Sequence, residues 1–160
     1  MKRIIFFRHL PHIWDNGKYM INHKDYCALL ALGRTLNIDA IIHSPRTCDH
    51  ISALALNQGC KSKVTVKDEY LMDVSFLRPS RFLKELRQTT NNNGLESIAI
   101  IASQKILEIL GCPSLEHGEF YIQYEEPPTS SNYLVHGSIE DFRDSKHEVL
   151  FPEEAVNNLY

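Results

Sequence analysis

The chain has 160 residues, of which 43% are hydrophobic and 23% charged, with a formal net charge of -3. A chain of this size can bury one core, so we expect a single globular domain over residues 1–160. The weakly acidic charge offers no basic surface to a nucleic-acid backbone, and no apolar run approaches the roughly 20 residues of a membrane-spanning helix. We therefore expect neither a nucleic-acid nor a membrane partner.

The start of the chain and its cysteines favour a cytoplasmic location. Residues 1–3 carry two basic side chains and lead directly into an apolar run, which is too short and charged too early for a signal peptide. The four cysteines contain no C-x-x-C pair, which favours free thiols over disulfides or a zinc knuckle. The sequence leaves the oligomeric state open.

The first half of the chain predicts strands alternating with helices. Residues 3–7 and 39–43 are short apolar runs without period-two alternation, which is typical of buried parallel strands. Residues 28–36 and 47–56 carry apolar side chains three or four positions apart, which predicts helices.

The second half predicts a helix over residues 81–88 that is started by Pro79, and then a loop over residues 88–94. A buried strand over 97–102 and a short helix over 105–110 follow, then strands over 119–124 and 132–136 separated by a loop. This order predicts the α/β class, a three-layer sandwich with a mostly parallel central sheet flanked by helices.

Polar residues directly follow the three predicted parallel strands. They are Arg8 and His9 after the first, Ser44 and Arg46 after the second, and Ser103 after the third. In open α/β sheets the ligand crevice lies at the carboxyl ends of the strands, so we expect these residues to share one site. Guanidinium groups and helix N-termini at such a site favour an anionic ligand.

Residues 8–15 read Arg-His-Leu-Pro-His-Ile-Trp-Asp, residues 29–33 read Leu-Leu-Ala-Leu-Gly and residues 41–45 read Ile-Ile-His-Ser-Pro. In this order they resemble the histidine phosphatase superfamily, in its phosphoglycerate mutase-like and phosphohistidine phosphatase-like branch. The resemblance is strongest over residues 1–56 and continues more weakly through residues 71–73 and 97–104. It implies the corresponding fold and a histidine nucleophile that accepts a phosphoryl group.

The resemblance also implies roles for individual residues. His9 matches the nucleophile, Arg8 matches the first phosphate-binding arginine, and Asp73 matches the acid that protonates the leaving group. Phosphoryl transfer depends mainly on positioning and on cations that compensate the phosphoryl oxygens, so this division of labour is physically reasonable.

The sequence departs from this family pattern at several positions. Ser103 stands where the resemblance implies the second histidine, and Cys48 stands where it implies the second arginine. Asp15 replaces an asparagine and places an anion near the expected phosphate, which at an effective dielectric of about 20 and a distance of about 4 Å costs about 4 kcal/mol. These departures imply a degenerate member with an incomplete phosphate pocket. Arg46 and His136 remain open as replacements for the missing groups.

We expect no metal and no cofactor. The spacing of His9, His12, His43 and His50 matches no standard zinc pattern, so we do not expect these histidines to form a metal cluster. The catalytic candidates are therefore His9 and Asp73, and the ligand-binding candidates are Arg8, Asp15, Ser44, Arg46 and Ser103.

Two functional hypotheses remain open. In the favoured one, the protein binds a small anionic or phosphorylated molecule, or a protein partner, with impaired or altered phosphatase activity. In the alternative, an enzyme uses His9 with Asp15 or Asp73 for weak phosphomonoesterase work or for other acid–base chemistry, because a carboxylate beside a histidine raises its basicity.

Overall fold

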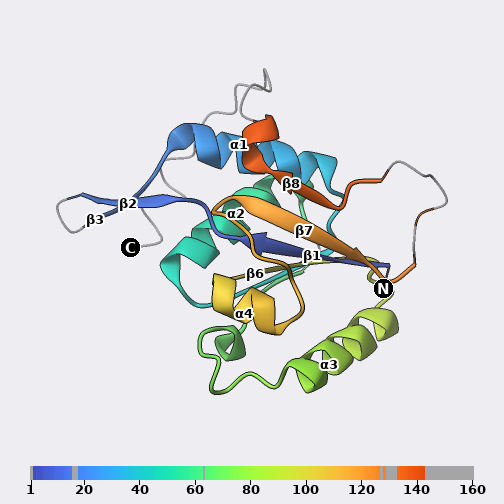
Figure 1. The fold of residues 1–160 in the computed structure, drawn as a ribbon. Coiled ribbons are helices and arrows are strands. Elements are labelled where there is room, and N and C mark those ends of the chain that lie inside the picture. Colours follow the sequence, from blue (N-terminus) through green and yellow to red (C-terminus); the bar gives the residue numbers. More distant parts are fainter. Residues whose placement is uncertain (1, 16–17, 63, 127, 129–132, 143–160) are drawn as a thin grey trace.

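The computed structural model describes residues 2–15, 18–62, 64–126, 128 and 133–142, and only the backbone of residues 12–15 and 18–19 (Figure 1). The strands are β1 (Arg3–Arg8), β2 (His12–Asp15), β3 (Lys18–Ile21), β4 (Ala40–His43), β5 (Val64–Lys67), β6 (Ser97–Ala102), β7 (Glu119–Tyr124) and β8 (His136–Ser138). The helices are α1 (His23–Thr35), α2 (Thr47–Cys60), α3 (Pro79–Asn92) and α4 (Gln104–Ile109), with 3-10 turns η1 (Glu69–Leu71) and η2 (Ile139–Phe142).

The central sheet has the strand order β5-β4-β6-β1-β7-β8. Strands β5, β4, β6 and β1 are mutually parallel, and β7 runs antiparallel to both β1 and β8. Strand β1 therefore lies inside the sheet, and its carboxyl end is flanked by β6, with Arg8 opposite Ala102. This is the mostly parallel sheet that the sequence predicts. A separate hairpin of β2 and β3 follows β1.

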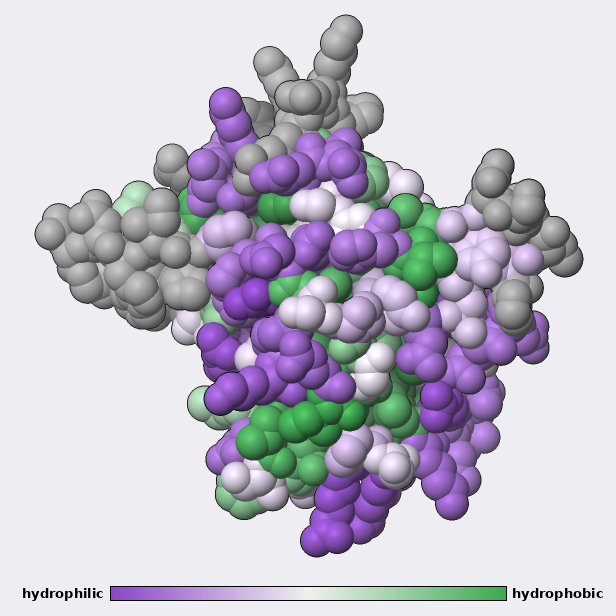
Figure 2. Space-filling view, viewed as in Figure 1, coloured by the Kyte–Doolittle hydropathy of each residue, from purple (hydrophilic) through white to green (hydrophobic). Residues whose placement is uncertain are grey.

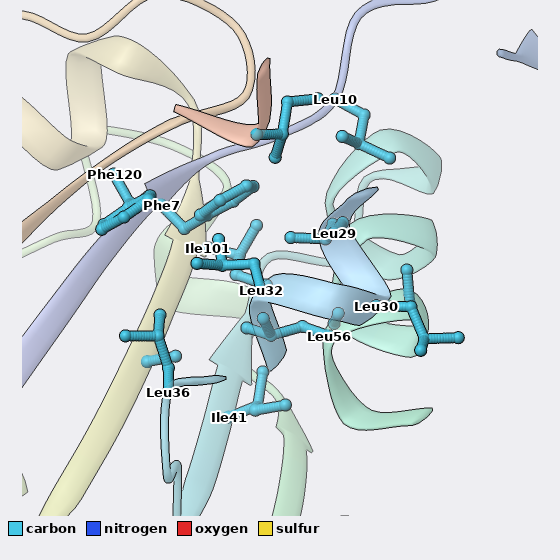
Figure 3. Packing of buried hydrophobic residues seen from close by; sticks show 14 of the residues in the cluster. Phe7, Leu10, Leu29, Leu30, Leu32, Leu36, Ile41, Leu56, Ile101 and Phe120 are labelled. Carbon is cyan, nitrogen blue, oxygen red and sulfur yellow. The ribbon is translucent and has the colours of Figure 1, made fainter. Parts of the chain in front are cut away.

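Helices cover both faces of the sheet, as Figure 1 shows. Successive side chains of a strand point to opposite faces, so Ile5 and Phe7 join one buried cluster with α1 and α2. Ile4 and Phe6 join the other cluster, which includes side chains of α3 and α4. Figure 3 shows the first cluster, in which Phe7 lies beside Ile101 of β6. The α/β sandwich expected from the sequence is thereby confirmed.

Three local predictions differ from the structure. The loop predicted over residues 88–94 is wrong, because α3 continues to Asn92; Leu86 and Thr90, four residues apart, are both buried and extend its inner face. The β2–β3 hairpin and β5 were not predicted, and all residues of β5 are exposed, so no burial pattern marks it. The strand predicted over 132–136 is β8 at His136–Ser138, and residues 129–132 lie outside the described part.

The surface is mainly hydrophilic on the face shown in Figure 2, with a hydrophobic area in the lower part of the view, where Figure 1 draws η1 and α4. The exposed apolar side chains of these segments and of the loop after η1 are Met72, Val74, Phe76 and Ile109. The four cysteines form no disulfide. Within the described ranges, no helix has the length and apolar character that crossing a bilayer requires.

Candidate functional site

Arg8 ends β1 and points toward the segment between α4 and β7. Its guanidinium donates to the carbonyl oxygen of Leu115 at 2.7 Å and lies 3.2 Å from Nε2 of His117. Because a guanidinium only donates, Nε2 of His117 must accept, which places the ring proton of a neutral His117 on Nδ1. The Nε of Arg8 is buried and has no hydrogen-bond partner among the described residues.

His9 follows Arg8 and is only 4% exposed. Its Nδ1 lies 2.9 Å from the carbonyl oxygen of Leu10, and because a carbonyl only accepts, Nδ1 carries the proton. The lone pair of neutral His9 is therefore on Nε2. The ring centroid of His9 lies 4.9 Å from that of His117, so one guanidinium and two imidazoles gather at the end of β1.

The backbone of the neighbouring segment explains why His117 reaches this place. The N–H of Gly118 donates to the carbonyl oxygens of Arg8 and His9, at 3.2 and 3.1 Å. Gly118 has a φ of 79°, a conformation that favours glycine. His117 is not among the residues predicted from the sequence, although a His-Gly pair directly before a predicted strand indicates such a position.

Ser44 and Asp49 form a buried pair where β4 leads into α2. The hydroxyl of Ser44 donates to Oδ2 of Asp49 in a short hydrogen bond, and the N–H of Arg46 donates to the same hydroxyl at 3.2 Å. Oδ1 of Asp49 is buried and has no partner among the described residues. Burial raises the pKa of Asp49, while Ser44 and then Arg46 act in the opposite direction.

Hydrogen bonds through Ser52 of α2 connect Leu10, the residue that follows His9, to Cys48 in the first turn of that helix. The N–H of Leu10 donates to Oγ of Ser52 at 3.0 Å, and Oγ of Ser52 donates to the carbonyl oxygen of Cys48 at 2.9 Å. This contact brings together one ring nitrogen of His9, Sγ of Cys48 and one carboxylate oxygen of Asp49, which all lie within 4.8 Å of one another. All three side chains are buried. Burial also raises the pKa of the Cys48 thiol, with Asp49 as the next cause.

Two other predicted residues, Ser103 and Arg46, lie at the carboxyl ends of the parallel strands. Ser103 is half-buried and occupies the N-cap position of α4 directly after β6, one residue beyond the Arg8–Ala102 pair. Arg46 is half-buried at the N-cap of α2. The side chain of Asp15 lies outside what the structure describes.

Asp73 lies in the exposed turn after η1. Its carboxylate accepts from the N–H of Ser75 at 2.8 Å, and this hydrogen bond lowers the pKa of Asp73. The carboxyl group is therefore ionised at neutral pH and is poorly suited to donate a proton to a leaving group. Asp73 lines a concavity together with Pro45, Met72 and Phe76, and neither Arg8 nor His9 lines it.

The remaining histidines of the sequence analysis lie in other contacts. His136 lies on the edge strand β8, and its Nε2 is 3.3 Å from a carboxylate oxygen of Glu119 on β7. The rings of His43 and His50 are stacked with centroids 5.0 Å apart. Nδ1 of His43 is 2.8 Å from the carbonyl oxygen of Ser44, and burial lowers the pKa of His43.

Comparison with known proteins identifies the fold through structure alone. No family model matches the sequence. No curated protein matches it either. Sixty-eight chains of solved structures match.

One similar structure is the putative phosphohistidine phosphatase SixA of Agrobacterium tumefaciens, with a TM-score of 0.56 and 13% identity, over 79% of this chain and 99% of that one. The protein histidine phosphatase SixA complexed with tungstate has a TM-score of 0.60 and 12% identity, over 87% of this chain and 98% of that one. A mycobacterial glucosyl-3-phosphoglycerate phosphatase in complex with VO3 has a TM-score of 0.55 and 8% identity, over 76% of this chain and 90% of that one. These neighbours share the phosphoglycerate mutase-like fold, and the resemblance seen in the sequence agrees with them.

Proposed function

We propose that this chain, which has the fold of the histidine phosphatases, binds a small phosphoryl-type oxyanion at Arg8, His9 and His117 and hydrolyses phosphomonoesters weakly or not at all. The observation that supports this proposal is the contact of the Arg8 guanidinium with His117, whose ring lies 4.9 Å from that of His9. Guanidinium N–H groups and the ring N–H of His117 donate strongly to tetrahedral oxyanions, and His9 adds a donor at Nε2 only in its protonated form, because its Nδ1–H is engaged by Leu10. The buried Nε of Arg8, which has no partner within the described ranges, adds a donor that an oxyanion would satisfy.

Two features favour binding over turnover. His9 is 4% exposed, so a phosphomonoester has little room to reach Nε2 in line for displacement. Cys48 and Asp49, neither of which is a cation, lie beside His9. Phosphoryl transfer relies on cations that compensate the negative charge of the phosphoryl oxygens, and these two side chains supply none.

The binding part is tested by thermal unfolding of the full chain in a chelating buffer at increasing tungstate concentration. A ligand that binds only the folded state stabilises it in proportion to the logarithm of concentration once the site is nearly saturated. We expect this stabilisation in the wild type and in His136→Ala, and its loss in His117→Ala. His136 is the matched control because it is an exposed histidine on the far edge of the sheet. No tungstate effect, or an equal effect in both variants, would contradict the binding site.

The turnover part is tested with a generic phosphomonoester substrate. We expect the wild type and His9→Ala to give the same low rate, close to that of buffer. A substantial wild-type rate that His9→Ala abolishes would show that His9 remains an effective nucleophile, and would overturn this part of the proposal.

A further inference from the structure

We propose that His9, Cys48 and Asp49 form a binding site for a divalent ion of the zinc class. This proposal goes beyond the oxyanion site and does not depend on it. The three side chains offer nitrogen, sulfur and oxygen, and their ligand atoms lie within 4.8 Å of one another. Imidazole, thiolate and carboxylate are the three ligand types that Zn²⁺ takes in proteins.

The three ligand atoms are near enough to one another for a single ion to bind all of them. Zinc ligands lie at about 2.0–2.3 Å from the ion, so neighbouring ligand atoms in a tetrahedron are about 3.3–3.7 Å apart. Because the separations among the three atoms do not exceed 4.8 Å, an ion needs to draw them together by about 1.5 Å at most. Three protein ligands leave the fourth tetrahedral position for a water molecule or an exogenous ligand.

The burial and hydrogen bonding of Asp49 are independent support for a cation at this place. Asp49 is 0% exposed, and Ser44 satisfies only one of its carboxylate oxygens. The other oxygen is buried without a partner among the described residues. A buried carboxylate with an unpaired oxygen is costly unless a cation or a donor compensates it, and a bound divalent ion provides that compensation.

The hydrogen bond of His9 determines which ring nitrogen carries the lone pair that a metal ligand needs. Metal-bound histidines commonly donate their second ring N–H to a carbonyl or carboxylate, which directs the other nitrogen at the ion. Nδ1 of His9 is engaged by the carbonyl oxygen of Leu10, so Nε2 carries the lone pair. Ser44 holds the Asp49 carboxylate in a similar manner. The carbonyl of Leu10 and the hydroxyl of Ser44 are therefore hydrogen-bond partners of the kind that commonly support metal ligands.

The small size of an ion fits the burial of the cluster. Cys48 is 5% exposed and His9 is 4% exposed. A single ion with one bound water fills far less space than a phosphorylated metabolite. Arg46 is the fixed cation whose charge acts on both Cys48 and Asp49, and its attraction to them competes with the ion.

The test is a Co²⁺ titration of the full chain after chelator treatment and without added oxyanion. We expect one equivalent of Co²⁺ to produce a thiolate-to-cobalt charge-transfer band, which Zn²⁺ then removes by displacement. Cys48→Ala should lose the band, whereas Cys112→Ala should keep it. Cys112 is the matched control because it is equally buried, at 5% exposed, and lies in the cluster on the other face of the sheet. The absence of the band in the wild type, or its persistence in Cys48→Ala, would overturn the site.

Two further measurements do not depend on Cys48→Ala folding correctly. Asp49→Asn should keep the charge-transfer band but weaken Co²⁺ binding, because a neutral amide replaces a carboxylate ligand. X-ray absorption of the zinc-loaded wild type should show one sulfur and two or more nitrogen or oxygen ligands. A shell without sulfur, or with two sulfurs, would overturn the assignment. Because the tungstate experiment is carried out with chelator present, the metal site and the oxyanion site fail or succeed separately.

Discussion

Helices α1 and α2 cross so closely at Gly59 that an added methyl group should destabilise the fold. A Cβ atom at Gly59 would lie 2.1 Å from the carbonyl oxygen of Leu30 and 3.0 Å from the backbone nitrogen of Arg34, whereas ordinary contact begins at 3.4 Å. Both neighbours are backbone atoms, so no rotamer change relieves the clash and the helices must separate by more than about 1 Å.

The expected size of the effect follows from two opposing contributions. Overpacking a core costs about 1–3 kcal/mol, and the rigid backbone contact places Gly59→Ala at the upper end of this range. Alanine recovers about 1 kcal/mol of helix propensity relative to glycine. We therefore expect a net loss of about 2 kcal/mol in the free energy of unfolding. For a chain of this size that corresponds to a fall of about 4–8 °C in Tm.

Urea and thermal unfolding measure this loss directly, with Thr89→Ala on the exposed side of α3 as the control. Gly33→Ala should act in the same direction, since its Cβ would lie 2.4 Å from the carbonyl oxygen of Leu56. If Gly59→Ala left the midpoint unchanged or raised it, helix propensity would outweigh the contact, and the close crossing of α1 and α2 would be refuted.

Three further changes should be measurable by unfolding of the chelator-treated protein. Burial lowers the pKa of His43 in the folded state, so stability should fall as pH drops below the unfolded value of about 6.5, and His43→Gln should flatten this dependence. Burial raises the pKa of Tyr26 to about 12, so stability should fall as pH rises above 10. Tyr26→Phe should remove that fall and cost about 1 kcal/mol at neutral pH, because the hydroxyl donates to Gln58. Asp39→Ala should cost about 1–3 kcal/mol, since Oδ2 of Asp39 accepts from two backbone N–H groups at the start of β6, and Asp39→Asn should cost less.

Each of these predictions has a clear contrary result. An equal acid dependence in the wild type and in His43→Gln would show that another group binds the proton on unfolding. If Tyr26→Phe lost stability above pH 10 as the wild type does, a group other than Tyr26 would be releasing the proton on unfolding. Equal losses in Asp39→Ala and Asp39→Asn would show that the accepting oxygen is not the stabilising feature.

The layered fold was predictable because local features of the sequence dictate it. The apolar runs at residues 3–7 and 97–102 have no polar alternation, and only a strand covered on both faces tolerates that composition. The β2–β3 hairpin and β5 were not predictable in this way. Residues 64–67 are all exposed, so pairing with β4 rather than burial makes them a strand.

The sequence by itself determined that Arg8 and His9 follow a buried strand, because strand length and the residues after it are local properties. Only the tertiary structure decided what surrounds them. His117 reaches His9 through the Gly118 backbone, across more than a hundred residues of chain, and Cys48 and Asp49 reach it through Ser52. These contacts of His9 depend on how the carboxyl ends of separate strands meet. The spacing of residues along the chain does not predict the distances between side chains at those strand ends.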